Sequence, residues 1–347
     1  MAENGERKLG IWERYLTLWV GLCIITGVGL GRLFPEISNI LGRFEIAHIS
    51  IPIAICLFFM IYPIMVQIDF KQVIKAGKTP KPIVATLIIN WCIKPFTMAF
   101  LAWLFLGVLF KGFLSPEMAL QYRAGMILLG VAPCTAMVLM WSYLARGNMG
   151  HTLVMTAINS LTMVFLYAPL ARLLLGISGI IVPWKTIALS VTIYICVPLI
   201  VGYFTRDQSI KRKGIEWFEK RLAPPLHTLS TVALLITLIV LFSMQGKVII
   251  KLPAAIGMIA CGIFVNILLV FIITYFISKI IHLDYEDAAP TAIIAGSNHF
   301  EVAIAVATTV FGVNSGAALA TVVGVLTEVP IMLFLVWLCK KTRGFFR

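Results

Sequence analysis

Charged side chains are scarce in this chain. Only 12% of its 347 residues are Asp, Glu, Lys or Arg, whereas 60% are hydrophobic. A soluble domain typically carries about 25% charged residues, because its surface must face water. The low share therefore excludes a water-soluble fold. It also excludes a disordered chain, which combines low hydrophobicity with high charge.

Signatures of several enzyme and metal-binding classes are also absent. The seven cysteines show neither a CxxC pair nor Cys/His zinc spacing. The chain has no Walker motif for ATP, no HExxH and no GxSxG segment. An ATP-driven pump, a metalloprotease and a serine hydrolase are therefore without support, and no cofactor is predicted.

Long apolar runs fill the chain instead. A helix needs about 20 predominantly apolar residues to cross a bilayer, and ten such segments follow one another with short loops between them. They cover residues 15–33, 49–68, 83–110, 126–144, 152–175, 187–204, 226–244, 253–277, 289–311 and 315–338. Continuous runs of this kind are typical of helices, whereas a membrane barrel shows short alternating strands. The sequence predicts an all-α polytopic membrane protein.

The distribution of Lys and Arg predicts the orientation. With ten spans both termini lie on one side, and that side carries 19 Lys and Arg residues against eight on the other. Cytoplasmic loops are enriched in these residues, so both termini are predicted to be cytoplasmic. Most of the bias comes from the loops at 69–81 and 206–221. Topology and anionic lipid thus explain the net charge of +13, and no nucleic-acid partner is expected.

Ten spans divide into two halves of five. An odd number gives the halves opposite orientations, which is the inverted-repeat design of secondary transporters. We expect one transmembrane domain over residues 1–347, with repeats at about 12–176 and 184–340. The Leu-Thr pairs of the fifth and tenth spans match at an offset of 165 residues, and this offset places Pro133 opposite Asn298.

Two polar segments interrupt the fourth and ninth spans, GVAPCTAMV at 130–138 and GSNHFEVAI at 296–304. Pro133 removes a backbone donor, and Gly296, Ser297 and Asn298 have low helix propensity. Irregular backbone at membrane depth is tolerated only where it is buried in protein or lines a wet cavity. We therefore expect helices 4 and 9 to be broken and to cross near the midplane. Two continuous helices with a kink are the alternative.

Three charged residues fall inside the predicted spans: Lys94, Glu301 and Glu328. A charge at the bilayer centre costs at least about 2.5 kcal/mol, so each is a functional candidate. Glu301 lies at the predicted break and is the candidate proton carrier, unless it only pairs with Lys94 or a helix terminus. Glu328 has either a functional role or caps backbone freed by Pro330. Lys94 is expected to neutralise a glutamate or to extend its flexible stem toward the membrane surface.

Other polar groups lie at or near the same segments. Cys134 follows the proline of the predicted break, where a thiol is a soft ligand, although buried cysteines are more often packing residues. His299 is either a proton relay or the partner of a neighbouring group. Asn90, Trp141 and Asn159 are more often contacts between helices than ligands of a solute. We expect Asn159 to hydrogen-bond to the fourth span.

The segments GVAPCTAMVLMWSYLARGN and GSNHFEVAIA, set in ten spans, resemble those of the arsenical-resistance permeases. These are arsenite exporters related to the bile-acid/sodium symporters, and the resemblance covers almost the whole chain. It implies export of arsenite, and in some members of antimonite, in exchange for protons. It also implies that Cys134 and Glu301 are required for transport, while Glu328 matches a further acidic position less closely.

The resemblance leads to a specific hypothesis. Arsenite is largely an uncharged trihydroxide at neutral pH, so its site needs hydrogen-bond partners rather than a counter-ion. Cys134 would contact the arsenic, Thr135, Ser297 and Asn298 would bind its hydroxyl groups, and Glu301 would carry the coupling proton. Asn90, Trp141, Asn159, His299, Glu328 and Lys94 would support these residues from around the site.

Three alternatives remain open: another kind of transporter, a receptor and an enzyme. A sodium-coupled symporter of organic anions would be expected to place an extra acidic pair at the crossing, where only Glu301 is predicted. A retinal-type receptor with Lys94 as a Schiff base does not fit ten spans and a repeat. An intramembrane hydrolase lacks a paired aspartate or a Ser/His constellation.

Overall fold

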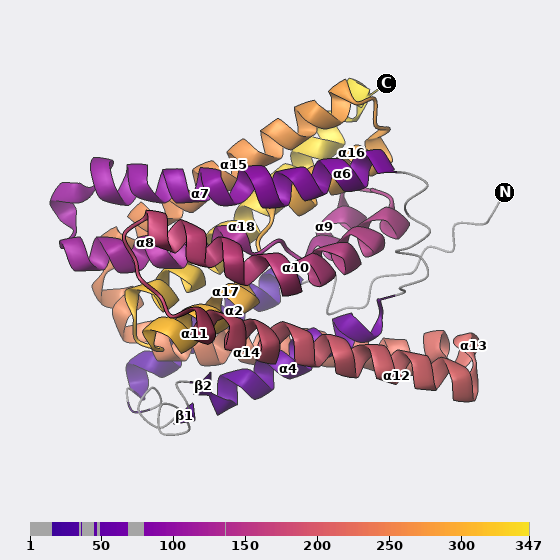
Figure 1. Ribbon diagram of the computed structural model, residues 1–347, viewed down its shortest axis with the longest axis horizontal. Coiled ribbons are helices and arrows are strands. Elements are labelled where there is room, and N and C mark those ends of the chain that lie inside the picture. Colours follow the sequence, from indigo (N-terminus) through magenta and orange to yellow (C-terminus); the bar gives the residue numbers. More distant parts are fainter. Residues whose placement is uncertain are drawn as a thin grey trace.

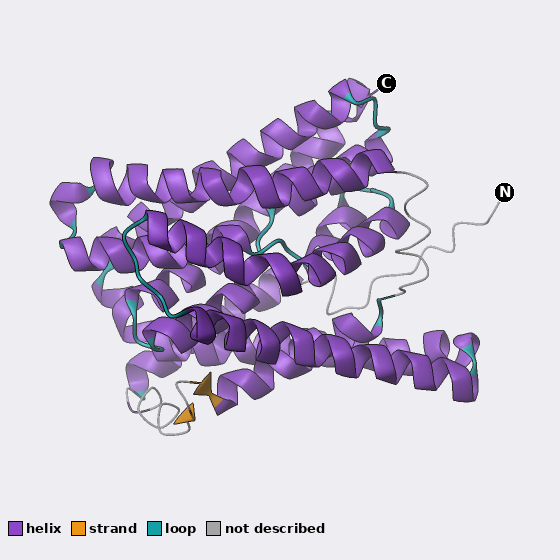
Figure 2. Ribbon diagram, viewed as in Figure 1, coloured by secondary structure: helices purple, strands orange, loops and turns teal. Residues whose placement is uncertain are grey.

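The computed structural model describes residues 16–34, 36, 45–46, 49–68, 80–135 and 137–346. Helices dominate this part of the chain, as Figures 1 and 2 show. Two very short antiparallel strands, β1 (Glu45–Ile46) and β2 (Ile49–Ser50), precede the second long helix. The predicted helical class is confirmed. The predicted cytoplasmic loop at 69–81 lies outside the described residues, except for its last two positions.

The helices follow the predicted spans closely. They are α2 (Leu16–Leu33), α4 (Ile51–Val66), α6 (Pro80–Ile88), η2 (Ile89–Ile93), α7 (Lys94–Ala102), η3 (Trp103–Leu109), η4 (Lys111–Phe113), α8 (Pro116–Val131), α9 (Met137–Leu144), α10 (Met149–Ile177), α11 (Trp184–Val191), η5 (Thr192–Cys196), α12 (Val197–Lys213), α13 (Ile215–Trp217), η6 (Phe218–Leu222), α14 (Ala223–Lys251), α15 (Pro253–Ile280), α16 (Tyr285–Gly296), α17 (Phe300–Phe311), α18 (Gly316–Lys341) and η7 (Arg343–Phe346). Several consecutive elements continue as one rod, such as α6, η2, α7 and η3.

Six of these rods are long and apolar enough to cross a membrane, counted over the described residues. They correspond to the predicted third, fifth, sixth, seventh, eighth and tenth spans. The first and second spans appear as the shorter apolar helices α2 and α4, and the fourth and ninth are each divided in two. The arrangement as ten spans in two inverted repeats stays a prediction.

The fourth span begins earlier than predicted. α8 starts at Pro116 and not near residue 126, with Ser115 as the N-cap that accepts a hydrogen bond from the Met118 amide at 3.3 Å. Proline at the first helical position and serine before it are favoured at this end. The polar residues Glu117 and Arg123 lower the hydropathy of the first two turns, which hid the start of the helix.

Three of the widened, π-type turns lie just before a proline: η2 before Pro95, η5 before Pro198 and η6 before Pro224. Proline has no N–H and its ring clashes with the carbonyl one turn earlier. A local widening relieves that clash, and such turns are frequent at functional sites. In η2 the widened turn carries the Lys94 amide onto the carbonyl of Ile89, five residues earlier.

The helices form two groups, which can be followed in Figure 1. In the first group, α14 packs against α2 and α4, and α12 packs against α4; we call these four helices the panel. In the second, α7, α8, α10, α15, α16, α17 and α18 pack on one another; we call them the core group. α17 also contacts α4 of the panel, so it lies at the boundary between the two groups.

Glycines allow a close approach within the panel. A Cβ atom added to Gly31 would lie 2.1 Å from the Ser243 carbonyl oxygen, and one added to Gly27 would lie 2.8 Å from that of Ile239. Both pairs are four residues apart, so one face of α2 lies against one face of α14 over a full turn. This is the small-residue packing that brings helix backbones together in membranes.

This packing yields a first prediction. Replacing Gly31 with Ala is expected to lower the free energy of unfolding by about 1–3 kcal/mol, because the methyl group would overlap backbone that cannot rotate away. Gly29 on the same helix is the matched control, since an added Cβ meets nothing within 4 Å there. Gly29→Ala is expected to be neutral or slightly stabilising. Thermal denaturation of the detergent-purified variants compares them, and equal melting temperatures would contradict the close approach.

Candidate functional site

Both predicted helix breaks are present, and they meet. α8 ends at Val131 and α9 begins at Met137, while α16 ends at Gly296 and α17 begins at Phe300. The two extended segments form an isolated antiparallel bridge between Pro133 and Asn298. These are the residues that the offset of the predicted repeats aligned. Two continuous, kinked helices are thereby ruled out.

Backbone groups at the crossing satisfy one another in part. The His299 amide donates to the Ala132 carbonyl at 2.8 Å, which ties the two segments together. Proline at 133 has no N–H to place, which removes one donor that would otherwise need a partner. Side chains from other helices bind further backbone groups of the same segment.

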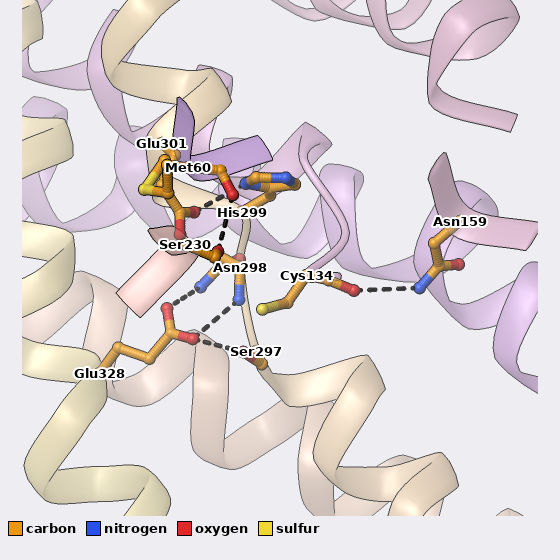
Figure 3. Close-up of polar contacts among 9 residues, drawn as sticks. All are labelled: Met60, Cys134, Asn159, Ser230, Ser297, Asn298, His299, Glu301 and Glu328. Atoms are coloured by element: carbon orange, nitrogen blue, oxygen red, sulfur yellow. Dashed lines mark hydrogen bonds and ion pairs between the residues drawn. The ribbon is translucent and has the colours of Figure 1, made fainter. Parts of the chain in front are cut away.

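Glu328 on α18 supplies most of that support. Its buried carboxylate accepts hydrogen bonds from the Ser297 hydroxyl at 2.5 Å, the Asn298 amide at 3.0 Å and the Asn298 side-chain nitrogen at 3.4 Å (Figure 3). The expectation that it caps backbone freed by Pro330 is wrong. α18 passes through Pro330 unbroken, and Glu328 caps the interrupted ninth span instead.

Lys94 approaches the same segment from another helix. Its side-chain nitrogen donates to the Ser297 carbonyl oxygen, and the residue is completely buried. It therefore does not extend toward the membrane surface. Lys94 binds the carbonyl of Ser297 and Glu328 binds its hydroxyl, so the two opposite charges contact the same residue. The expectation that Lys94 neutralises a glutamate matches this arrangement, with Glu328 and not Glu301 as the nearby acid.

Glu301 has a different partner. It lies in the first turn of α17, and its carboxylate is 2.7 Å from the Nδ1 atom of His299. Both side chains are only 1% exposed. The first turn of α17 also places this carboxylate at the N-terminal end of a helix, where a negative charge is favoured. The expectation of an ion pair between Glu301 and Lys94 is not met.

Cys134 lies on the other extended segment of the crossing, between α8 and α9. It is 1% exposed, and its side chain points toward the segment that carries Ser297 and Asn298 (Figure 3). Its carbonyl accepts a hydrogen bond from the Asn159 amide at 3.3 Å, and the Asn159 oxygen accepts one from Asn90 at 3.2 Å. The predicted link from Asn159 to the fourth span is confirmed, and it fixes the backbone of Cys134.

Several buried polar atoms around the crossing have no hydrogen-bond partner among the described residues. They include Thr135 Oγ1, Trp141 Nε1, Asn298 Oδ1 and His299 Nε2. Nearly all buried polar atoms in proteins are paired, so a cluster of unpaired ones calls for an occupant. The hydroxyl, indole and amide atoms among them are neutral donors and acceptors, which suit a small uncharged polar solute.

One polar residue near the site was missed from the sequence. Asn266 lies fully buried in α15, and the Thr97 hydroxyl, one turn after Lys94, donates to its side-chain oxygen at 2.8 Å. A single asparagine in an otherwise apolar span was the available signal. This contact ties α7 to α15 close to Lys94.

The site is closed in this structure. Thr135, Ser297 and Asn298 are fully buried, and Cys134 and Glu301 are 1% exposed. Access for a solute from either side therefore requires the helices around the crossing to move.

Comparison with known proteins adds three findings. Residues 54–252 match the model of the Sodium Bile acid symporter family. The chain is 54% identical to an uncharacterized transporter of Synechocystis sp., over 97% of this chain and 91% of that one. It is 45% identical to the arsenical-resistance protein Acr3 of Alkaliphilus metalliredigens, over 98% and 95% of the two chains. It is 33% identical to Acr3 of Corynebacterium glutamicum, over 95% and 89%.

The role of Glu328 as a cap gives a second prediction. Glu328→Ala is expected to destabilise the protein by about 3–5 kcal/mol, because it leaves Lys94 without its counter-charge and Ser297 and Asn298 without an acceptor. The control is Glu286→Ala, which removes an exposed glutamate paired with Arg343 at 2.7 Å. A surface pair contributes at most about 1 kcal/mol. Melting temperatures in detergent measure both, and a similar loss in the two variants would refute the capping role.

Proposed function

The chain belongs to the sodium bile acid symporter family, and on this premise we propose that it exports arsenite across the cell membrane in exchange for protons. The family membership makes it a multi-pass transporter, and the arsenical-resistance relatives, which match over nearly the whole chain, favour arsenite. The sodium-coupled import of organic anions is less well supported by these relatives. We place both termini in the cytoplasm, as the distribution of Lys and Arg favours.

One observation carries the proposal for the substrate. The Cys134 side chain is buried at the crossing of two interrupted helices, among neutral polar atoms that lack partners. Arsenite offers three hydroxyl groups and a thiophilic arsenic atom, and its neutral form needs no counter-ion. Cys134 would contact the arsenic, and Thr135, Ser297 and Asn298 would bind the hydroxyl groups.

A single sulfur contact suits a transporter. Soft thiolate ligands bind soft centres well, and several of them together would hold the arsenic too tightly for release. The other six cysteines lie on other helices: α2, α4, η2, η5, α15 and α18. With one thiol at the site, binding stays reversible.

We assign the coupling proton to the Glu301–His299 pair. In the inward-facing state the ionised pair and arsenite occupy the site together. In the outward-facing state a proton from outside binds the pair, and arsenite leaves. The protonated carrier returns and releases the proton to the cytoplasm. Movement of the core group against the panel would expose the crossing to each side in turn.

The third prediction tests the sulfur contact. Cys134→Ala is expected to reduce arsenite uptake into inside-out membrane vesicles to background, because the arsenic loses its soft ligand. Cys92→Ala is the control, since Cys92 lies exposed on η2 and faces away from the core. Uptake is measured as vesicle arsenic content after equal membrane expression has been verified. Undiminished transport by Cys134→Ala would exclude the ligand role.

The fourth prediction tests the proton carrier. In inside-out vesicles with an acidic lumen, arsenite added outside is expected to dissipate the pH gradient when the wild-type protein is present. Glu301→Gln keeps the shape of the side chain but cannot ionise, so arsenite should no longer dissipate the gradient. Glu286→Gln on the exposed start of α16 is the control. A lumenal pH dye reports the result, and normal dissipation by Glu301→Gln would place the proton carrier elsewhere.

A further inference from the structure

We propose that the ammonium group of Lys94 occupies a built-in cation site at the break between α16 and α17, where a sodium-coupled carrier would hold a sodium ion. This inference deepens the proposed function and rests on it. It explains why a member of a sodium-symporter family would work without sodium.

The position of the ammonium group is the first argument. Lys94 donates to the Ser297 carbonyl, which follows directly on the C-terminal end of α16. The C-terminal end of a helix carries partial negative charge and free carbonyl groups. In secondary transporters, such unwound carbonyls and half-helix ends are the groups that coordinate sodium ions or protons.

The oxygen atoms of neighbouring groups are the second argument. The carboxylate of Glu328 accepts a hydrogen bond at 2.5 Å from the hydroxyl group of the same Ser297 whose carbonyl binds Lys94. The side-chain oxygen of Asn298 has no partner among the described residues. A backbone carbonyl, a carboxylate and an amide oxygen are ligands that hard cations prefer. An ionised carboxylate at the buried position of Glu328 needs a positive charge nearby to compensate it.

The way Lys94 reaches this place is the third argument. Its side chain is completely buried, and the lysine ammonium is a compact point charge with three donors on a flexible stem. The widened turn η2 precedes it, and Pro95 follows it at the start of α7. The Thr97–Asn266 hydrogen bond at 2.8 Å holds this part of α7 to α15. The helix is thus built to deliver one positive charge to the break.

A tethered cation differs from a bound ion in one respect. It supplies a positive charge to the Ser297 carbonyl but, being covalently attached, cannot leave with the substrate. Sodium therefore has no vacant place at this break, and a sodium gradient cannot drive the exchange. Removal of the ammonium group should recreate a site for a small monovalent cation.

The experiment measures the effect of sodium on thermal stability in detergent, and it does not involve arsenite. Melting temperatures are compared in sodium chloride and in choline chloride at equal ionic strength. The wild-type protein is expected to melt at the same temperature in both salts. Lys94→Ala is expected to melt at least about 2 °C higher in sodium, because an ion that binds only the folded state stabilises it. Lys94→Ala/Glu328→Gln should lose that difference.

Two results would overturn the inference: stabilisation of the wild-type protein by sodium, or a folded Lys94→Ala variant that does not respond to sodium. If Lys94→Ala is not recovered in either salt, Lys94→Ser replaces it and the same comparison decides. Because the readout is cation binding, failure here leaves the arsenite-uptake results untouched. Loss of arsenite transport in the tests above would equally leave this result standing.

Discussion

The structure depends on how the backbone N–H and carbonyl groups of two interrupted helices find hydrogen-bond partners in the protein interior. Two helices of the core group break at the same depth, and each break leaves N–H and carbonyl groups that cost several kcal/mol if unpaired. The Ala132 carbonyl, the Glu328 carboxylate and the Lys94 ammonium together bind the segment from Ser297 to His299. Two oppositely charged side chains that bind the same segment are therefore what allows a non-helical backbone to persist there.

This bracing divides the polar groups of the site into two sets. The charged groups Lys94 and Glu328 bind the backbone and the hydroxyl of Ser297. The groups left without partners, such as Thr135 Oγ1 and Asn298 Oδ1, are neutral. Because Lys94 and Glu328 are engaged with the protein, neutral hydroxyl and amide groups are left to meet a solute. That property fits an uncharged trihydroxide better than an organic anion.

The two helix groups explain how a closed site can still serve transport. The panel helices α2 and α14 approach to backbone distance at Gly27 and Gly31, which is the close packing expected of a rigid unit. The core group is tied across the breaks by the same contacts that satisfy the backbone. α17 contacts both groups and carries Glu301 in its first turn. The residue proposed to carry the proton therefore lies at the boundary between the two groups.

The sequence alone determined the membrane class and the places of the two breaks, because span length and helix interruption depend on local residues. It also singled out Lys94, Glu301 and Glu328, since buried charges are costly wherever they point. Their partners were decided only by tertiary structure. Lys94 and Ser297 are 203 residues apart, and Glu328 reaches 30 residues back to Asn298. Helix propensity and hydropathy are local properties, so they assign no partner to a residue at such separations. Which of Glu301 and Glu328 is the acid near Lys94 follows from how α7, α16 and α18 pack.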